Sequence, residues 1–234
     1  MGGHAVTLVL LRHGEAVGNG EGRYLGHLDV PLTDRGRRQA DEAGRALAAV
    51  PVAAVYTSDL VRARETARRV MALWKDAPPL RVTAALRELA FGTWEGKTYA
   101  EVAAHDPARV RRWYADPLTV APPGGERMTD LLARLGLFLA YVWHRHAGQT
   151  VLVVTHGGCI RALRAFWGRA QPWATGTWEA FWSAGVAPGA WTVWSIESRE
   201  GNEHAAGKDV DGTRDGVGCR EERTGDGLVP PVCT

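Results

Sequence analysis

Three ionisable residues stand almost side by side where an apolar run ends. The segment VTLVLL covers residues 6–11, and Arg12, His13 and Glu15 follow it directly. A short continuous apolar run of this kind is typical of a strand that is covered on both faces. Charged groups are costly to bury and usually lie on open surface. Their place at a buried strand end therefore indicates chemistry, provided that distant segments supply matching groups.

Two other segments end in a similar way. VAAVYTS (52–58) reads as a strand, and Arg62 lies one helical turn after its end. TVLVVTH (150–156) is the clearest buried strand of the chain, and it runs into His156 and then Gly157. Ligands of parallel sheets bind outside the carboxyl ends of the strands. We therefore expect two histidines and two arginines to meet around one pocket at this edge.

This set of side chains suits a phosphoryl group. Arginine offers a planar fork of donors to phosphate oxygens and keeps its charge at any relevant pH. Free backbone N–H groups at a helix start, such as that of Gly157, add donors and a favourable dipole. A neutral imidazole is a good nucleophile near neutral pH. The remaining requirement is a proton donor for the leaving alcohol, which a carboxyl group can provide.

Alternating strands and helices must position these groups. The pattern predicts an α/β fold: a mostly parallel sheet with helices on both faces, a three-layer sandwich, and a closing antiparallel hairpin near the C-terminus. Strands are expected at 6–11, 52–58, 80–83 and 150–156, and helices at 33–50, 59–74, 126–146 and 157–167, the first capped by Thr33. Residues 86–125 hold many helix breakers and are expected to be irregular. The hairpin is expected from 177–183 and 190–196.

Composition separates a catalytic domain, residues 1–198, from a tail. Residues 199–234 are rich in glycine, acidic and without aromatic side chains, so we expect disorder there. The rest of the chain is only modestly basic, which favours a small anionic substrate over a nucleic acid. Three scattered cysteines indicate neither disulfides nor a zinc site. No run is long enough to cross a membrane, so we expect a soluble cytoplasmic protein.

Several blocks resemble a known family. LRHGEAVGN (11–19) is similar to the R-H-G-E signature of the histidine phosphatase superfamily, in the branch related to cofactor-dependent phosphoglycerate mutase. Five further blocks match in the family's order: GRYLGHLDVPLTDRGRRQA, YTSDLVRARETA, LRELAFGTWEG, PPGGER and VLVVTHGGCIRAL. The resemblance covers roughly residues 5–196.

The resemblance implies a role for each of five residues. His13 would be the nucleophile that becomes phosphohistidine. Arg12 and Arg62 would hold the phosphate oxygens, and His156 would stabilise the charge that develops on them. Glu88, in LRELAFG, would protonate the leaving oxygen and then activate water.

Weaker expectations concern substrate contacts. The resemblance implies that Asn19 adds a phosphate contact and that Gly26 lines the entrance. No metal or organic cofactor is implied, and the partner would be a small phosphorylated metabolite. The chain departs from the family pattern at Ala16, Gly18, Leu25 and Arg127, and Trp113 and Tyr114 lie in the segment expected to roof the pocket. These positions leave the substrate open, and the sequence gives no oligomeric state.

Three functions compete. A phosphomonoesterase transfers the phosphoryl group to water, whereas a mutase returns it to another hydroxyl. Mutases of the family carry a longer insertion after the Glu block, while here Glu88 and Gly124 are only 36 positions apart, which favours the phosphatase. A catalytically silent binding module usually lacks the nucleophile or a clamp residue, and all five groups are present here.

Overall fold

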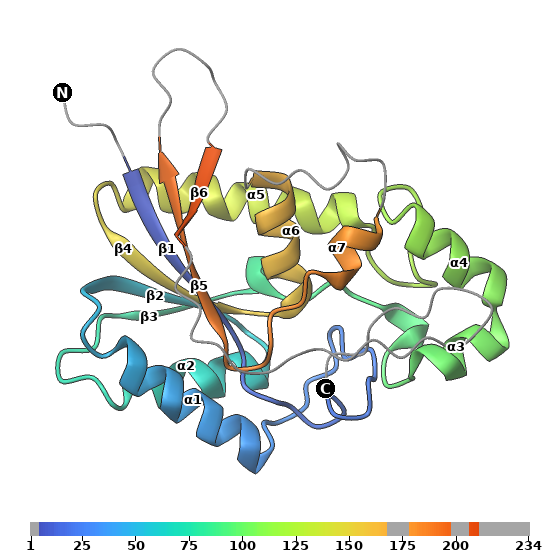
Figure 1. The fold of residues 1–234 in the computed structure, drawn as a ribbon, viewed down its shortest axis with the longest axis horizontal. Helices are drawn as coiled ribbons and strands as arrows, with labels where there is room; N and C mark the ends of the chain where they lie inside the picture. The colour runs from blue at the N-terminus through green and yellow to red at the C-terminus, as the bar shows by residue number, and fades with distance from the viewer. Residues whose placement is uncertain (1–4, 168–177, 198–205, 211–234) are drawn as a thin grey trace.

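The computed structural model describes residues 5–167, 178–197 and 206–210, and its six strands form one sheet in the order β3-β2-β4-β1-β5-β6 (Figure 1). β1 (Ala5–Arg12), β2 (Val52–Ser58), β3 (Leu80–Thr83) and β4 (Thr150–Thr155) pair in parallel. β5 (Trp191–Glu197) runs antiparallel to β1 and to β6 (Ala206–Val210). The mostly parallel sheet predicted from the sequence is confirmed.

Helices cover both faces of this sheet. α1 (Asp34–Leu47) and α2 (Val61–Met71) lie on one face, and α5 (Met128–Arg145) and α6 (Gly157–Trp167) on the other (Figure 1). Side chains of β1 alternate between the two layers, as the pleat requires. Leu8 and Leu10 belong to the core formed with α5 and α6, whereas Val9 and Leu11 belong to the core formed with α1 and α2. A strand buried on both faces therefore carries the continuous apolar run.

α1 begins where the sequence predicts. Thr33 has extended backbone, and its Oγ1 accepts a hydrogen bond from the N–H of Gly36 at 3.0 Å. Ala40, Ala43 and Leu47 are buried at helical spacing. The cap satisfies a donor that the helix leaves unpaired, and the apolar stripe packs against the sheet.

Residues 86–125, which were expected to be irregular, contain more regular structure than their glycines and prolines indicate. Two 3₁₀ turns, Ala84–Leu86 and Gly92–Trp94, precede α3 (Tyr99–His105) and α4 (Pro107–Ala115). Thr98 and Glu101 form a capping box, and the Asp106 side chain accepts from the N–H of Arg109 at the start of α4. Pro107 occupies the first position of α4. Proline is favoured there because it has no N–H, and an N–H at that position would have no partner within the helix.

The first half of the expected hairpin was assigned wrongly. Residues Glu179–Ser183 form the short helix α7, and the antiparallel partners of β5 are β1 and β6. Aromatic residues favour strands, but three of them here stand at helical spacing. The rings of Trp178 and Phe181 lie 5.5 Å apart, and those of Phe181 and Trp182 lie 4.8 Å apart. The ring of Trp182 also lies 4.7 Å from that of Trp113 and 5.1 Å from that of Tyr114, so packing against α4 favours the helix.

Most of the predicted tail, residues 199–234, lies outside the described residues. Its residues 206–210 form β6, which pairs with β5 from Glu197↔Ala206 to Val193↔Val210. Within the described residues the sheet thus gains an edge strand from beyond the boundary drawn at residue 198.

Candidate active site

The carboxyl ends of β1 and β4 bring two histidines together. In the parallel register Arg12 pairs with Thr155, so the residues that follow, His13 and His156, are neighbours at the rim of the sheet. Their ring centroids lie 5.0 Å apart at 63°. Both side chains are buried. Residues 143 positions apart in the sequence thus meet as the register of the two strands requires.

The hydrogen bonds of His13 assign its protons. Nδ1 lies 2.7 Å from the carbonyl oxygen of Gly14, which can only accept, so Nδ1 carries the hydrogen. Nε2 accepts from Nε of Arg62 at 3.3 Å and therefore bears the lone pair. Burial, with the nearby charges of Arg62 and Arg12, lowers the pKa of His13 well below its usual 6.5. The imidazole is neutral at physiological pH, and its lone pair is on Nε2.

Arg62, the second residue of α2, is held by the loop before α1. Its Nη1 donates to the carbonyl of Leu28 at 2.6 Å and its Nη2 to the carbonyl of Gly26 at 2.7 Å. The side chain is buried, and burial lowers its pKa while the charge of Glu88 opposes that shift. Arginine stays protonated under such conditions. A fixed positive charge therefore lies beside Nε2 of His13.

Gly26 contacts Arg62 through its backbone carbonyl, and its place at the entrance stays a prediction. Its backbone has φ +48°, in the left-handed region, and a Cβ there would lie 2.2 Å from Oε1 of Glu95. Its carbonyl orients Arg62. The structure thus gives Gly26 a part in positioning the arginine.

Arg12 lies against the start of α6. Its Nη1 donates to the carbonyl of Val186 at 2.6 Å, and a Cβ on Gly157 would lie 3.4 Å from its Cζ. The loop before β5 also holds the backbone here, since the N–H of Gly189 lies 3.2 Å from the Arg12 carbonyl and 3.1 Å from that of His13. The guanidinium and the N-terminus of α6 face the same space.

His156 is a buried histidine at the centre of this edge of the sheet. It is fully buried, and among the described residues neither of its ring nitrogens has a hydrogen-bond partner. Burial, with the charges of Arg62, His13 and Arg12, lowers its pKa well below 6.5. Buried polar groups nearly always have partners, and an exception calls for an explanation such as a ligand. An anion between His13 and the two arginines would supply the missing acceptor.

Glu88 lies against the first turn of α6. Its Oε2 accepts from the N–H of Gly158 at 2.9 Å, and its Oε1 accepts from the N–H of Leu89 at 2.9 Å. A Cβ on Gly158 would lie 2.2 Å from Oε1, so this close approach depends on glycine. The carboxyl group thus joins Arg12 and Gly157 at the same rim.

Asn19, from which a phosphate contact is expected, and Trp113 and Tyr114, in the segment expected to roof the pocket, have other partners in the structure. The side-chain oxygen of Asn19 accepts from the N–H of Ala16 at 2.9 Å and closes a local turn, so a phosphate contact of Asn19 stays a prediction. Trp113 is buried, and its ring lies 4.7 Å from that of Trp182. The Tyr114 hydroxyl lies 2.8 Å from that of Tyr24. Trp113 and Tyr114 therefore pack against Trp182, which lines the cavity beside Glu88, and do not line that cavity themselves.

Two of the four departures from the family pattern, Leu25 and Arg127, lie away from the candidate site. Leu25 is buried in the loop before α1, and Arg127 is exposed at the start of α5, where its backbone N–H donates to Asp130. Neither side chain lines the cavity beside Glu88.

A cavity of about 80 Å³ opens beside Glu88 and contains residues that sequence reasoning missed. Arg12, Glu88 and the two glycines at the start of α6 form part of its lining, and Arg161 is a further arginine there. The other lining residues are apolar: Leu89, Phe91, Met128, Leu131, Phe181 and Trp182. Arg161 stands in the block VLVVTHGGCIRAL, five residues after His156, which is the one signal that could have found it. Leu89 and Phe91 follow Glu88 directly, whereas the other apolar members come from α5 and α7, whose approach to the site no local pattern encodes.

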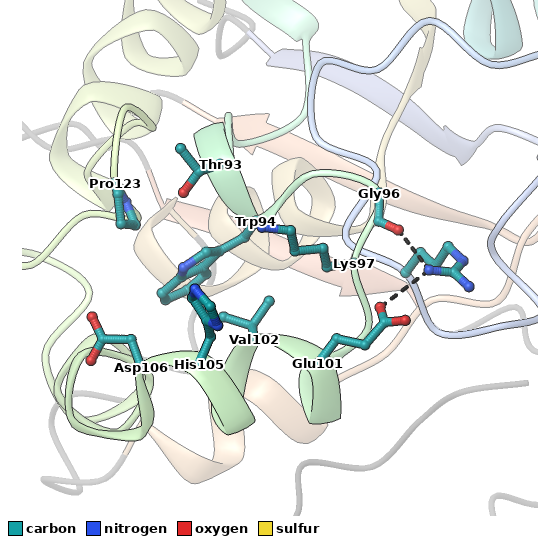
Figure 2. A pocket seen from close by; sticks show the side chains of 10 residues that line it. Thr93, Trp94, Gly96, Lys97, Glu101, Val102, His105, Asp106 and Pro123 are labelled. Carbon is teal, nitrogen blue, oxygen red and sulfur yellow. Dashed lines mark hydrogen bonds and ion pairs between the residues drawn. The ribbon is translucent and has the colours of Figure 1, made fainter.

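A larger cavity, about 540 Å³, lies away from this site along α3 (Figure 2). None of the five candidate catalytic residues lines it. Arg23 in its wall donates to the carbonyl of Gly96 at 2.7 Å and to the carboxylate of Glu101 at 3.2 Å. These bonds fasten the loop after β1 to the first turn of α3.

Within residues 5–167, 178–197 and 206–210, no group of three or more His, Cys, Asp and Glu side chains is arranged to hold a metal ion. No helix in the same ranges is long and apolar enough to cross a membrane.

Comparisons with known proteins agree with this geometry. The family model described as "Histidine phosphatase superfamily (branch 1)" matches residues 8–205. The chain is 38% identical over 164 residues to 2,3-bisphosphoglycerate-dependent phosphoglycerate mutase 2 of Gloeobacter violaceus, covering 67% of this chain and 73% of the relative. It is 32% identical over 194 residues to the adenosylcobalamin/alpha-ribazole phosphatase of Escherichia coli, covering 83% and 92%. The structure of a mycobacterial glucosyl-3-phosphoglycerate phosphatase aligns with a TM-score of 0.72 and 34% identity over 82% of this chain and 91% of that one.

Proposed function

Because this chain belongs to the histidine phosphatase superfamily (branch 1), we propose that it is a phosphoric monoester hydrolase that works through a phosphohistidine at His13. Relatives named as phosphatases for phosphoserine, alpha-ribazole and glucosyl-3-phosphoglycerate support a hydrolase of small phosphorylated metabolites. The roles of the individual residues follow from the contacts described above.

In the first step Nε2 of His13 attacks phosphorus and the bond from phosphorus to the ester oxygen breaks. The lone pair is ready because Nδ1 holds the ring hydrogen against the Gly14 carbonyl. Arg12 and Arg62 neutralise the equatorial oxygens, and His156 donates one N–H to them. The carboxyl group of Glu88 gives its proton to the departing alcohol.

In the second step water cleaves the phosphohistidine. The carboxylate of Glu88 takes a proton from water, the hydroxide oxygen bonds to phosphorus, and the phosphorus–nitrogen bond breaks. His13 regains its lone pair, and inorganic phosphate leaves. The sum is one ester and one water converted to one alcohol and one phosphate, with the enzyme unchanged.

The observation that carries this proposal is the unpartnered imidazole of His156. A fully buried ring with two unsatisfied nitrogens lies 5.0 Å from the nucleophilic ring and close to two arginines. A phosphoryl group supplies acceptors for the N–H of His156 and for the two arginines, and a phosphorus atom for the lone pair of His13 to attack. A catalytically silent module would have no need of a neutral His13 with its lone pair aimed at this space.

A mutase is the alternative, because one relative of 38% identity carries that name. The two activities share the first step and differ in whether water or a second hydroxyl receives the phosphoryl group. The short roof between Glu88 and Gly124 favours water.

The test is turnover and labelling of the purified protein with a panel of phosphomonoesters. The wild-type chain should release phosphate and form an acid-labile phosphoenzyme, and His13→Ala should do neither. His105→Ala, on exposed α3, is the control that should retain both. Labelling of His13→Ala equal to that of the wild type would remove His13 as the nucleophile, and transfer to a second metabolite without phosphate release would indicate the mutase.

A further inference from the structure

Glu88 lies in a segment that has little regular structure of its own. It follows the single 3₁₀ turn Ala84–Leu86 and precedes another at Gly92–Trp94. General acid catalysis requires the carboxyl group to lie within hydrogen-bond reach of the leaving oxygen. Something other than local secondary structure must therefore fix this segment.

Arg134, on the inner side of α5, contacts the backbone of this segment. Its Nη1 donates to the carbonyls of Ala85 at 2.9 Å and Arg87 at 2.6 Å, and its Nη2 donates to the carbonyl of Glu88 itself at 2.9 Å. The side chain is 19% exposed. Three carbonyls that no helix or strand satisfies thus converge on one guanidinium.

Glu126 completes the arrangement from the loop before α5. Its Oε1 accepts from Nε of Arg134 at 3.1 Å and its Oε2 accepts from Nη2 at 2.9 Å, a bidentate pair. The same Oε2 accepts from the N–H of Ala90 at 3.0 Å, and the N–H of Glu126 donates to the Ala90 carbonyl at 2.9 Å. Glu126 and Arg134 therefore hold the backbone on both sides of Glu88.

All five N–H donors of Arg134 are engaged in these bonds. Arginine has five donors in a rigid plane, and each has an acceptor on Glu126 or on the Glu88 segment. None is left for a phosphate oxygen. The residue therefore cannot act like Arg12 or Arg62.

We propose that Arg134, paired with Glu126, is a positioning residue that sets the Glu88 carboxyl group at the leaving oxygen. The proposal rests on the proposed function, since it assigns to Glu88 the part of proton donor. Arg134 fixes the main chain at Glu88, and the N–H of Gly158 fixes its Oε2 at 2.9 Å. A small displacement of such a group costs rate because the proton must be transferred along a short, aligned path.

The test compares Arg134→Lys with Arg69→Lys. Lysine keeps the charge but has no planar fork, so it cannot reach three carbonyls and a carboxylate at once. Arg69 forms an equivalent bidentate pair with Asp41, at 2.9 and 2.6 Å, between α1 and α2 and remote from Glu88. Glu126→Gln, which removes one charge at constant shape, is a second variant of the same contact and should act in the same direction.

The kinetic readout is the dependence on the leaving group. Arg134→Lys should lower kcat about 10- to 100-fold for alkyl phosphates, a part of what general acid catalysis contributes, and much less for 4-nitrophenyl phosphate, whose leaving group needs no proton. Arg69→Lys should leave the ratio of the two rates unchanged. Equal losses for both substrates in Arg134→Lys would contradict the positioning role.

A second readout does not require activity. Exchange of the backbone amides of Leu89 and Gly158, which donate to the Glu88 carboxylate, is measured by NMR in each variant. Both amides should exchange about tenfold faster in Arg134→Lys and unchanged in Arg69→Lys. Unchanged exchange in Arg134→Lys would overturn the proposal in an active or an inactive protein. If the wild type shows no turnover but both amides still exchange faster in Arg134→Lys, the positioning role stands and the hydrolase proposal is refuted.

Discussion

Acidification should destabilise this protein through its two active-site histidines. His13 and His156 are buried, and burial together with the neighbouring arginines lowers the pKa of both well below 6.5. In the unfolded chain each would take up a proton below about pH 6.5, whereas in the folded protein each stays neutral. At pH values between the folded-state pKa and the unfolded-state pKa, the unfolded state binds more protons than the folded state. The free energy of unfolding therefore falls as the pH falls.

The size of this loss follows from the unfolded pKa. Between pH 7.5 and pH 5.5 each histidine that stays neutral in the folded state costs about 1.4 kcal/mol of stability, and the pair about 3 kcal/mol. That is a large share of the free energy of unfolding of a typical domain, which is about 5–15 kcal/mol. Asp59 and Glu101 also have a lowered pKa, from Arg87 and the Thr98 backbone respectively, but carboxyl groups titrate at about pH 4, outside this window.

Urea denaturation at pH 7.5 and at pH 5.5 measures the effect. The wild type should lose about 3 kcal/mol between the two, and His13→Asn or His156→Asn should lose only about half as much, because one titrating group is gone. His144→Asn, at an exposed position on α5, is the control and should lose as much as the wild type. The same loss in all three variants would refute the view that the buried imidazoles are neutral.

Three further outcomes are expected. Glu88→Gln should slow alkyl phosphates far more than 4-nitrophenyl phosphate, by about 100-fold or more, and equal slowing would remove Glu88 as the proton donor. Gly158→Ala places a Cβ 2.2 Å from Oε1 of Glu88, so turnover should fall about tenfold or more, whereas Gly20→Ala, with no atom within 4 Å of the new Cβ, should be silent in the same assay. A chain ended after residue 198 lacks β6 and should melt at a lower temperature than one ended after residue 210; identical melting temperatures would show that the β5–β6 pairing adds no stability.

The sheet and its site edge are predictable because they depend on local patterns. The continuous apolar runs of β1 and β4 mark strands buried on both faces, and parallel pairing then forces the residues that follow them, His13 and His156, to the same rim. The Thr33 cap and the stripe of α1 are equally local. Packing between distant segments is not local: the ring of Trp182 lies 4.7 Å from that of Trp113 and 5.1 Å from that of Tyr114, and Glu179–Ser183 is a helix and not the first strand of a hairpin.

The sequence by itself predicted the type of every candidate catalytic group and the edge of the sheet where two histidines and two arginines would meet, and the family resemblance added Glu88. Only the tertiary structure decided their states: the lone pair on Nε2 of His13, the burial of His156, and the bonds from Arg134 to the backbone of Glu88. The physical reason is the distance along the sequence between a residue and the partners that determine its state. Strand and cap patterns are set by neighbours a few residues apart, whereas the protonation and orientation of a side chain depend on partners such as Arg62 and Arg134, 49 and 46 positions away.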